Sequence, residues 1–120
     1  MDVRKLQKIA VAALEDIKGR DIEVINTTKL TSLFDRIIIA SADSTRQVKA
    51  LARNVQEKIK EAGGEVIGAE GEDSGEWVLV DLGSIVVHVM QPAVRSYYNL
   101  EELWHNPPKR AARRSGGTGE

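Results

Sequence analysis

The chain has no cysteine among its 120 residues, which excludes a disulfide framework and thiolate chemistry. This absence is typical of a reducing compartment. The sequence also lacks a run of ~20 apolar residues, the length that a membrane-spanning helix needs. The first 20 residues mix acids and bases through the apolar positions, unlike a signal peptide. The formal net charge of −1 argues against a general polyanion binder. We therefore expect one domain, large enough to bury a core, with no membrane partner.

Aromatic residues are also scarce, since Phe, Trp and Tyr make up 4% of the chain. Both tryptophans, both tyrosines and both histidines nevertheless lie within residues 77–105. Large rings gathered at one end of a small protein indicate a surface that binds something.

The first half of the chain alternates helix and strand signals. A helical apolar stripe begins after Asp2, a candidate N-cap, and Gly19 is expected to end that helix in a left-handed conformation. The stripe consists of Leu6, Ile9, Ala10, Ala13, Leu14 and Ile17. Residues 21–25 alternate as a short strand does. Residues 36–40 contain three consecutive isoleucines, which predict a central strand covered on both faces.

A second helix is predicted from Ser44, because Ser44 and Gln47 have the spacing of a capping box. Its buried stripe would be Val48, Leu51, Ala52, Val55, Ile59 and Ala62. Gly63 and Gly64 should end it, and residues 65–69 form a candidate strand. A strand, a long helix and a further strand predict a right-handed parallel crossover.

Two strands at 77–82 and 85–90 are separated only by Gly83 and Ser84, a pair that suits a type II′ hairpin. Pro92 fits the first turn of a short helix, and residues 99–104 give a further helical turn. The predicted fold is a single α/β domain over residues 1–107, with a mixed five-stranded sheet and helices packed on it. Residues 108–120, basic and then glycine-rich, are expected to be a disordered tail.

A two-residue turn sets the register of the hairpin. One face then carries only aliphatic residues, which belong to the core: Val78, Val80, Leu82, Ile85, Val87 and Val89. The other face carries Trp77, Leu79, Asp81, Val86, His88 and Met90. Asp81 and His88 become diagonal neighbours that could share a polar network. A terminal helix that covers this face and satisfies both groups is the simpler account of His88, whereas partial exposure and full burial of Trp77 are equally compatible with the pattern.

The aromatic segment that follows contains Arg95, Tyr97, Tyr98, Leu100 and Trp104. Two adjacent tyrosines cannot both point inward from one helix. We therefore expect one of them to be exposed and to act with Arg95 as an interface anchor.

These elements carry a family resemblance that extends up to residue 107. The matching segments are KGRDI (18–22), DRIIIAS (35–41), STRQV (44–48), GE (71–72), WVLVDLG (77–83), VHVM (87–90) and RSYYNLEELW (95–104). In order and without gaps, they resemble the ribosomal silencing factor family, also called the Iojap family.

The resemblance implies a cytoplasmic translational repressor without a cofactor and with a nucleotidyltransferase-like fold that lacks established catalysis. It implies binding to the large ribosomal subunit through ribosomal protein L-fourteen, on the face that meets the small subunit, so that the bound factor blocks subunit joining. Mapped onto this chain, the partner-binding residues would be Trp77, Asp81, His88, Met90, Arg95, Tyr97, Tyr98, Leu100 and Trp104.

The main alternative is an enzyme, a small metal-dependent nucleotidyltransferase. Asp21 and Glu23 would share one face of a strand, with Asp81 as a third carboxylate, but no Gly-Ser pair precedes them. Neither histidine has companions at zinc-ligand spacing. Ser44, His88 and Asp81 are the residue types of a triad, yet Ser44 is better explained as a helix cap.

Two further interactions remain open. The basic segment 109–114 could make minor contacts with ribosomal RNA, although a solvated tail explains it more simply. An exposed aromatic patch would favour a homodimer of the free protein.

Overall fold

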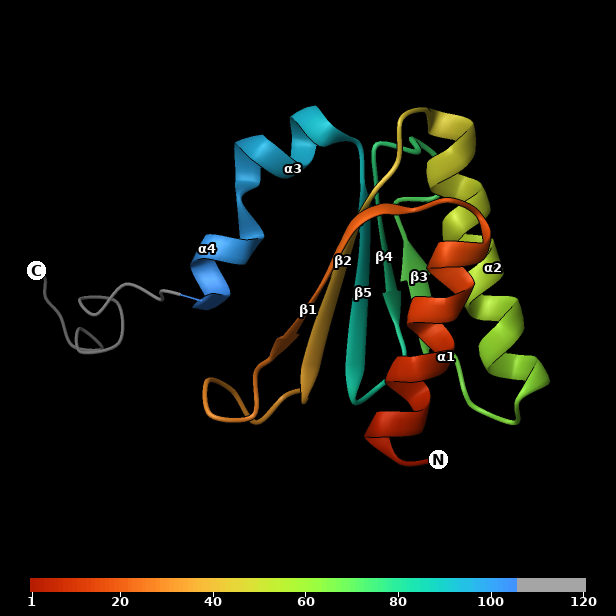
Figure 1. The fold of residues 1–120 in the computed structure, drawn as a ribbon, viewed down its shortest axis with the longest axis vertical. Coiled ribbons are helices and arrows are strands. Elements are labelled where there is room, and N and C mark those ends of the chain that lie inside the picture. The colour runs from red at the N-terminus through yellow and green to blue at the C-terminus, as the bar shows by residue number, and fades with distance from the viewer. Residues whose placement is uncertain (106–120) are drawn as a thin grey trace, which may run out of the picture.

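The computed structural model describes residues 1–105 and shows helices and strands in the predicted order (Figure 1). They are α1 (Val3–Asp16), β1 (Arg20–Asn26), β2 (Arg36–Ser41), α2 (Thr45–Glu61), β3 (Gly68–Glu70), β4 (Trp77–Asp81), β5 (Ile85–Met90), α3 (Pro92–Tyr98) and α4 (Leu100–His105). The predicted domain boundary at 107 and the tail at 108–120 lie outside the described residues. None of the helices in residues 1–105 is long and apolar enough to cross a membrane.

The five strands form one mixed sheet in the order β1-β2-β5-β4-β3. Strands β2 and β5 are parallel, whereas the other neighbouring pairs are antiparallel. Strand β3 therefore runs parallel to β2, as the crossover predicted, but β5 and β4 lie between them. The three isoleucines of β2 are almost completely buried in the centre of the sheet, which confirms the prediction.

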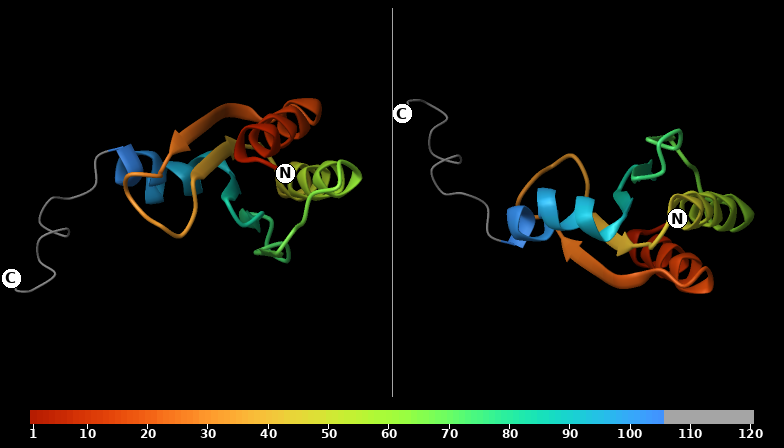
Figure 2. Two further views of the ribbon diagram at one scale, coloured as in Figure 1. Left: turned by 90° about the horizontal axis from the view of Figure 1, so that it is seen from below. Right: turned by 90° about the horizontal axis from the view of Figure 1, so that it is seen from above.

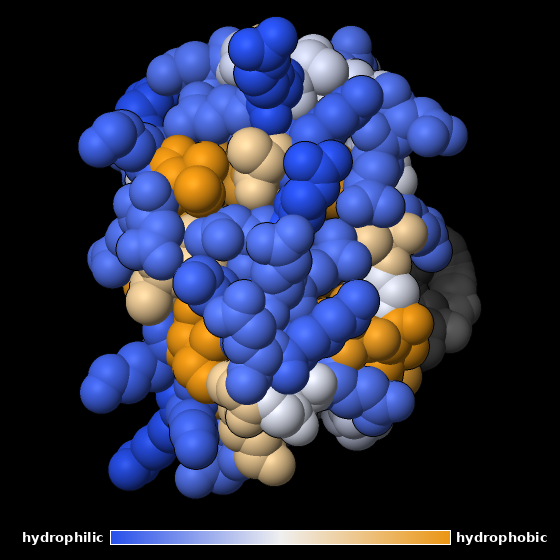
Figure 3. All heavy atoms as spheres, turned by 90° about the vertical axis from the view of Figure 1, so that its right-hand side faces the viewer, coloured by the Kyte–Doolittle hydropathy of each residue, from blue (hydrophilic) through white to orange (hydrophobic). Residues whose placement is uncertain are grey.

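Helices α1 and α2 cover one face of the sheet, and the segment of α3 and α4 lies on the other side (Figure 2). The larger core lies under α1 and α2, where Ile38 points among buried leucines, valines and alanines. The smaller core lies on the opposite face and contains Ile25, Ile37, Ile39 and Met90. Hydrophilic side chains cover most of the outer surface of α1 and α2, with a few apolar patches (Figure 3).

The helix starts follow the predicted caps, but one helix end does not. Asp2 Oδ1 accepts a hydrogen bond from the backbone N–H of Lys5, and Ser44 Oγ accepts one from Gln47. The predicted left-handed Gly19 is wrong, because Lys18 adopts that conformation with φ of 64°. Gly19 instead allows a close approach, since an added Cβ would lie 3.0 Å from the carbonyl oxygen of Leu14.

The third strand differs from the prediction in position and length. It spans Gly68–Glu70 and not residues 65–69, and it pairs with β4 at the edge of the sheet. Val66 packs against the larger core from outside the strand, whereas Ile67 stays 61% exposed. Of the two apolar residues that suggested a longer strand, Val66 makes a core contact and Ile67 lies on the surface.

Candidate functional site

The predicted hairpin register is confirmed at every pair. Trp77 lies opposite Met90, Leu79 opposite His88, and Asp81 opposite Val86. Gly83, at the turn, has φ of 90°, the left-handed region that the hairpin required of its first loop position. The face that contains Leu79, Val86 and His88 looks away from α1 and α2, and we call it the open sheet face.

A groove of about 750 Å³ runs along the open sheet face. Its floor is made by strands β2, β4 and β5, and α4 forms one wall. The lining side chains are mainly apolar and include Leu79, Val86, Leu100, Leu103 and Trp104. The groove is a preformed apolar surface of the size that binding sites commonly have.

His88 forms part of the groove and is bonded to Trp77. The indole Nε1–H of Trp77 donates to Nδ1 of His88 at 3.0 Å, and the two rings are 5.9 Å apart. Burial lowers the pKa of His88 from 6.5 to about 4, because the charged imidazolium is poorly solvated there. The imidazole is therefore neutral at physiological pH and can accept this bond.

Asp81 does not share a polar network with His88. Its Oδ1 accepts a hydrogen bond from the backbone N–H of Gly83 at 2.8 Å and so closes the hairpin turn. The predicted diagonal pairing is therefore wrong, as each group finds its partner elsewhere in the hairpin. The terminal helix was also expected to satisfy Asp81 and His88. This is wrong, because neither of their hydrogen bonds involves α3 or α4.

The tyrosines and Trp77 form an aromatic cluster beside the groove. Trp77 and Tyr98 have ring centroids 4.8 Å apart, and Tyr97 packs edge-on against Tyr98 at 5.0 Å. Tyr97 is 82% exposed and Tyr98 is 54% exposed, whereas Trp77 is only partly exposed. One exposed tyrosine was predicted, and the structure exposes both. A second hollow, of about 500 Å³, lies against these three rings and Glu76.

Arg95 is not the free interface anchor that the sequence suggested. Its Nε donates to Glu101 Oε2 at 2.7 Å, and its Nη1 donates to Ser41 Oγ at 2.8 Å. The Arg95 side chain is only 11% exposed. Together with Asn99, which turns the chain in a left-handed conformation, it holds α3 and α4 against the end of β2.

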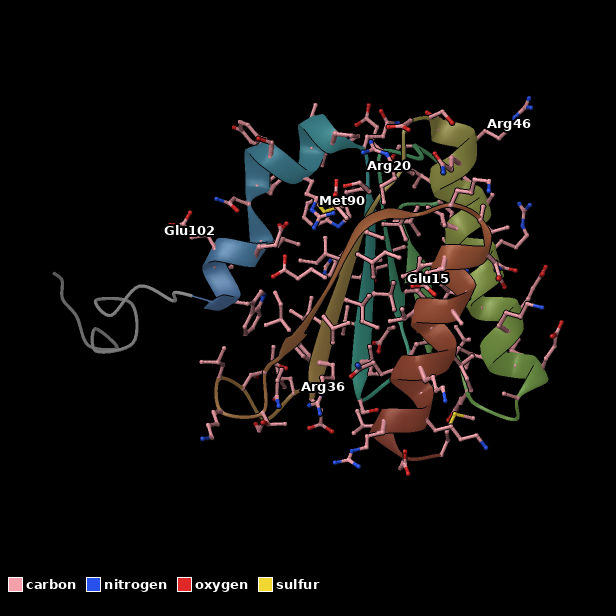
Figure 4. The ribbon with its side chains drawn as sticks, in the orientation of Figure 1. Glu15, Arg20, Arg36, Arg46, Met90 and Glu102 are labelled. Carbon is pink, nitrogen blue, oxygen red and sulfur yellow. The ribbon has the colours of Figure 1, made fainter. Side chains whose placement is uncertain are left out.

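The remaining predicted site residues support the surface from below or from the side. Met90 is completely buried and points from β5 toward α3 and α4 (Figure 4). Leu100 and Trp104 are partly buried and pack against Ile25, Ile37, Ile39 and Met90. Trp104 also contacts Phe34 edge-on, with ring centroids 5.6 Å apart. Met90 therefore cannot contact a partner directly.

Several exposed residues of this face were not among the predicted site residues. Leu33 is 80% exposed, Ile67 is 61% exposed and Leu103 is 46% exposed, and all three line the groove. Leu33 and Ile67 lie outside helices and strands, where periodicity gives no signal. Leu103 did have a signal in the sequence, because its helical spacing groups it with Leu100 and Trp104.

The carboxylates proposed for catalysis do not converge. The strand is irregular between Arg20 and Glu23, and Asp21 has φ of 50°, so the expected alternation is broken. Arg20 pairs with Ser41 at one end of β2, whereas Asp81 lies two strands from β2, level with Ile37 at the other end. Within residues 1–105 no three His, Cys, Asp or Glu side chains are placed to share a metal ion.

The triad residue types do not meet either. Ser44 caps α2 on the opposite face of the sheet, and it accepts a hydrogen bond from the backbone of Gln47. His88 is bonded to Trp77, and Asp81 to the hairpin turn. The three side chains therefore form no relay.

Comparison with known proteins gives consistent matches. The family model described as ribosomal silencing factor during starvation matches residues 1–117. The ribosomal silencing factor RsfS of Chromobacterium violaceum is 62% identical over 104 residues, which cover 87% of this chain and 85% of that protein. A crystal structure of a Chromobacterium violaceum protein has a TM-score of 0.87 at 59% identity and covers 90% of both chains. The mouse protein named mitochondrial assembly of ribosomal large subunit protein 1 is 34% identical over 97 residues, or 78% of this chain and 42% of that protein.

Proposed function

Since this chain belongs to the ribosomal silencing factor family, we propose that it represses translation by binding the large ribosomal subunit and blocking its joining with the small subunit. Membership makes the chain a ribosome-associated translational regulator. The proposal adds the partner, ribosomal protein L-fourteen, the steric mechanism and a cytoplasmic location. The observation that carries it is the family match over residues 1–117. The name of the mouse relative, which refers to the large subunit, is consistent with this choice of subunit.

The open sheet face and the aromatic cluster are the surface that we assign to the ribosome. Five large hydrophobic side chains are exposed there: Leu33, Ile67, Tyr97, Tyr98 and Leu103. Exposed apolar surface of this kind is uncommon on a free protein and is typical of an interaction site. Tyrosine and tryptophan are also the residue types that most often dominate binding energy.

A steric mechanism needs only a rigid surface and no chemistry. The open sheet face is rigid because its floor is a hydrogen-bonded sheet, and Arg95 fixes α3 and α4 beside it. A domain of this size bound at the joining face would occupy space that the small subunit needs. The separated carboxylates give the alternative enzymatic function no comparable support.

Sedimentation with separately purified subunits tests the proposal. The protein should travel with the large subunit and not with the small one. Tyr98→Ala should weaken this binding roughly thirtyfold, which corresponds to ~2 kcal/mol for a central aromatic contact. Arg53→Ala, on the exposed surface of α2, is the control and should bind normally. Binding to the small subunit alone would contradict the proposal. Equal binding of both variants would contradict the assigned surface.

A further inference from the structure

His88 presents a hydrogen-bond donor to the groove that the described chain leaves without an acceptor. Because Nδ1 accepts the indole N–H of Trp77, the proton of the neutral ring lies on Nε2. Within residues 1–105, Nε2 makes no hydrogen bond, and the only completely buried side-chain polar atom without a partner is Oε1 of Glu101. The Nε2–H group is therefore accessible from the groove, although the residue as a whole is only 8% exposed.

The surroundings of this donor restrict what can occupy the groove. Apolar side chains line most of it, including Leu79 opposite His88 and Trp104 on α4. The charged residues that line it within the described chain are Glu70 and Asp81, and no lysine or arginine is among them. A phosphate backbone would find no cation here, and a carboxylate would meet two others. An apolar segment with an uncharged acceptor fits both constraints.

Covering the donor without supplying an acceptor would be unfavourable. Nε2–H would lose water and gain no partner, which is costly in an apolar interface. The tautomer is set by the bond from Trp77, so the donor is already oriented before binding. A matching acceptor would therefore add specificity at little cost in conformational freedom.

We propose that the groove binds an apolar polypeptide segment of the ribosomal partner, and that His88 Nε2–H donates to a backbone carbonyl of that segment. This inference rests on the proposed function and adds to it the chemistry of the bound partner. It makes His88 a specificity-determining residue and Trp77 the residue that positions it.

Two substitutions test the roles of the two ring nitrogens of His88 independently. In His88→Asn, the side-chain oxygen lies near the position of Nδ1 and can still accept from Trp77, but no donor reaches the position of Nε2. In His88→Gln, the longer amide can place an N–H near the position of Nε2. With purified large subunits, we expect His88→Asn to bind roughly tenfold more weakly and His88→Gln to bind within about threefold of the native protein. Cooperative thermal melting checks that both variants fold.

The outcomes distinguish this inference from the proposed function. If the native protein fails to bind large subunits, the proposed function fails. If the native protein binds and His88→Asn binds equally well, only the present inference is overturned. Weaker self-association of His88→Asn in sedimentation equilibrium, with unchanged subunit binding, would assign the groove to a second copy of this chain. If His88→Asn instead bound protein-free large-subunit RNA more weakly than the native protein does, the groove would be assigned to nucleic acid. Either of these last two results would overturn the proposal.

A measurement on the native protein avoids any effect of substitution on folding. The chain has two histidines, so labelling with ¹⁵N-histidine gives a simple spectrum. Adding purified ribosomal protein L-fourteen should slow exchange of the His88 Nε2 proton with water, since a carbonyl would then hold it. Binding of L-fourteen with unchanged proton exchange would overturn the proposal.

Discussion

Acidification should destabilise this protein through His88 by an amount that the structure allows one to calculate. Burial lowers the pKa of His88 from 6.5 in the unfolded chain to about 4 in the folded protein. Between these values the unfolded chain binds more protons, so stability rises with pH. The contribution is complete above pH 6.5, falls as the pH falls, and stops changing below about pH 4, where both states are protonated.

Proton linkage with these two pKa values gives the magnitude. Lowering the pH from 7.5 to 5 should remove about 2 kcal/mol of unfolding free energy through His88. The loss should approach about 3 kcal/mol near pH 4. The penalty comes from burial of the charged imidazolium, and protonation at Nδ1 would in addition break the hydrogen bond from Trp77.

Urea unfolding at pH 7.5 and pH 5 measures the contribution of His88 to the unfolding free energy, as a difference between the native protein and a variant that lacks this histidine. His88→Asn is the control, because asparagine does not titrate and can still accept from Trp77. Other titrating groups change both proteins alike, so the native protein should lose about 2 kcal/mol more than the variant. Equal losses would refute the reasoning, since they would mean that His88 titrates in the folded protein as it does in the unfolded chain.

Four substitutions test the fold. Ile38→Asp should abolish cooperative thermal unfolding, because a completely buried position in the central strand offers no partner for a charge; a soluble, cooperatively melting variant would contradict that placement. Gly71→Ala should cost at least about 2 kcal/mol, since φ is 90° and a Cβ would lie 2.1 Å from the carbonyl oxygen of Trp77. Gly63→Ala, where φ is 88° but space is open, should cost less, and equal urea midpoints would refute the clash. Ser44→Ala should lose about 1 kcal/mol as the cap of α2, and an unchanged midpoint would exclude that role.

The fold followed from strong local signals in the sequence. Three consecutive isoleucines predicted the central strand, and a two-residue turn predicted each pair of the β4–β5 hairpin correctly. The misplaced features depend on contacts between distant segments. Gly19 is explained by its closeness to Leu14 and Leu51, and not by its own backbone conformation.

The sequence indicated the region of the candidate site but not its side-chain contacts. Register placed His88 and Trp77 on one face, yet it could not tell that they bond to each other and leave Asp81 to the turn. Arg95 seemed free because its partners, Ser41 and Glu101, meet it only after α3 folds back onto β2. Side-chain pairing depends on distances that spacing along the chain does not determine.

Light scattering of ribosomal subunit association, titrated with the protein, tests the central claim most directly. A steric blocker must be present in stoichiometric amounts, so inhibition should saturate near one protein per large subunit and reverse when the protein is removed. Pre-joined ribosomes should resist better than free subunits, because their joining faces are already covered. Lasting inactivation of excess large subunits by a trace of protein, dependent on an added nucleotide, would contradict the steric account and support an enzyme.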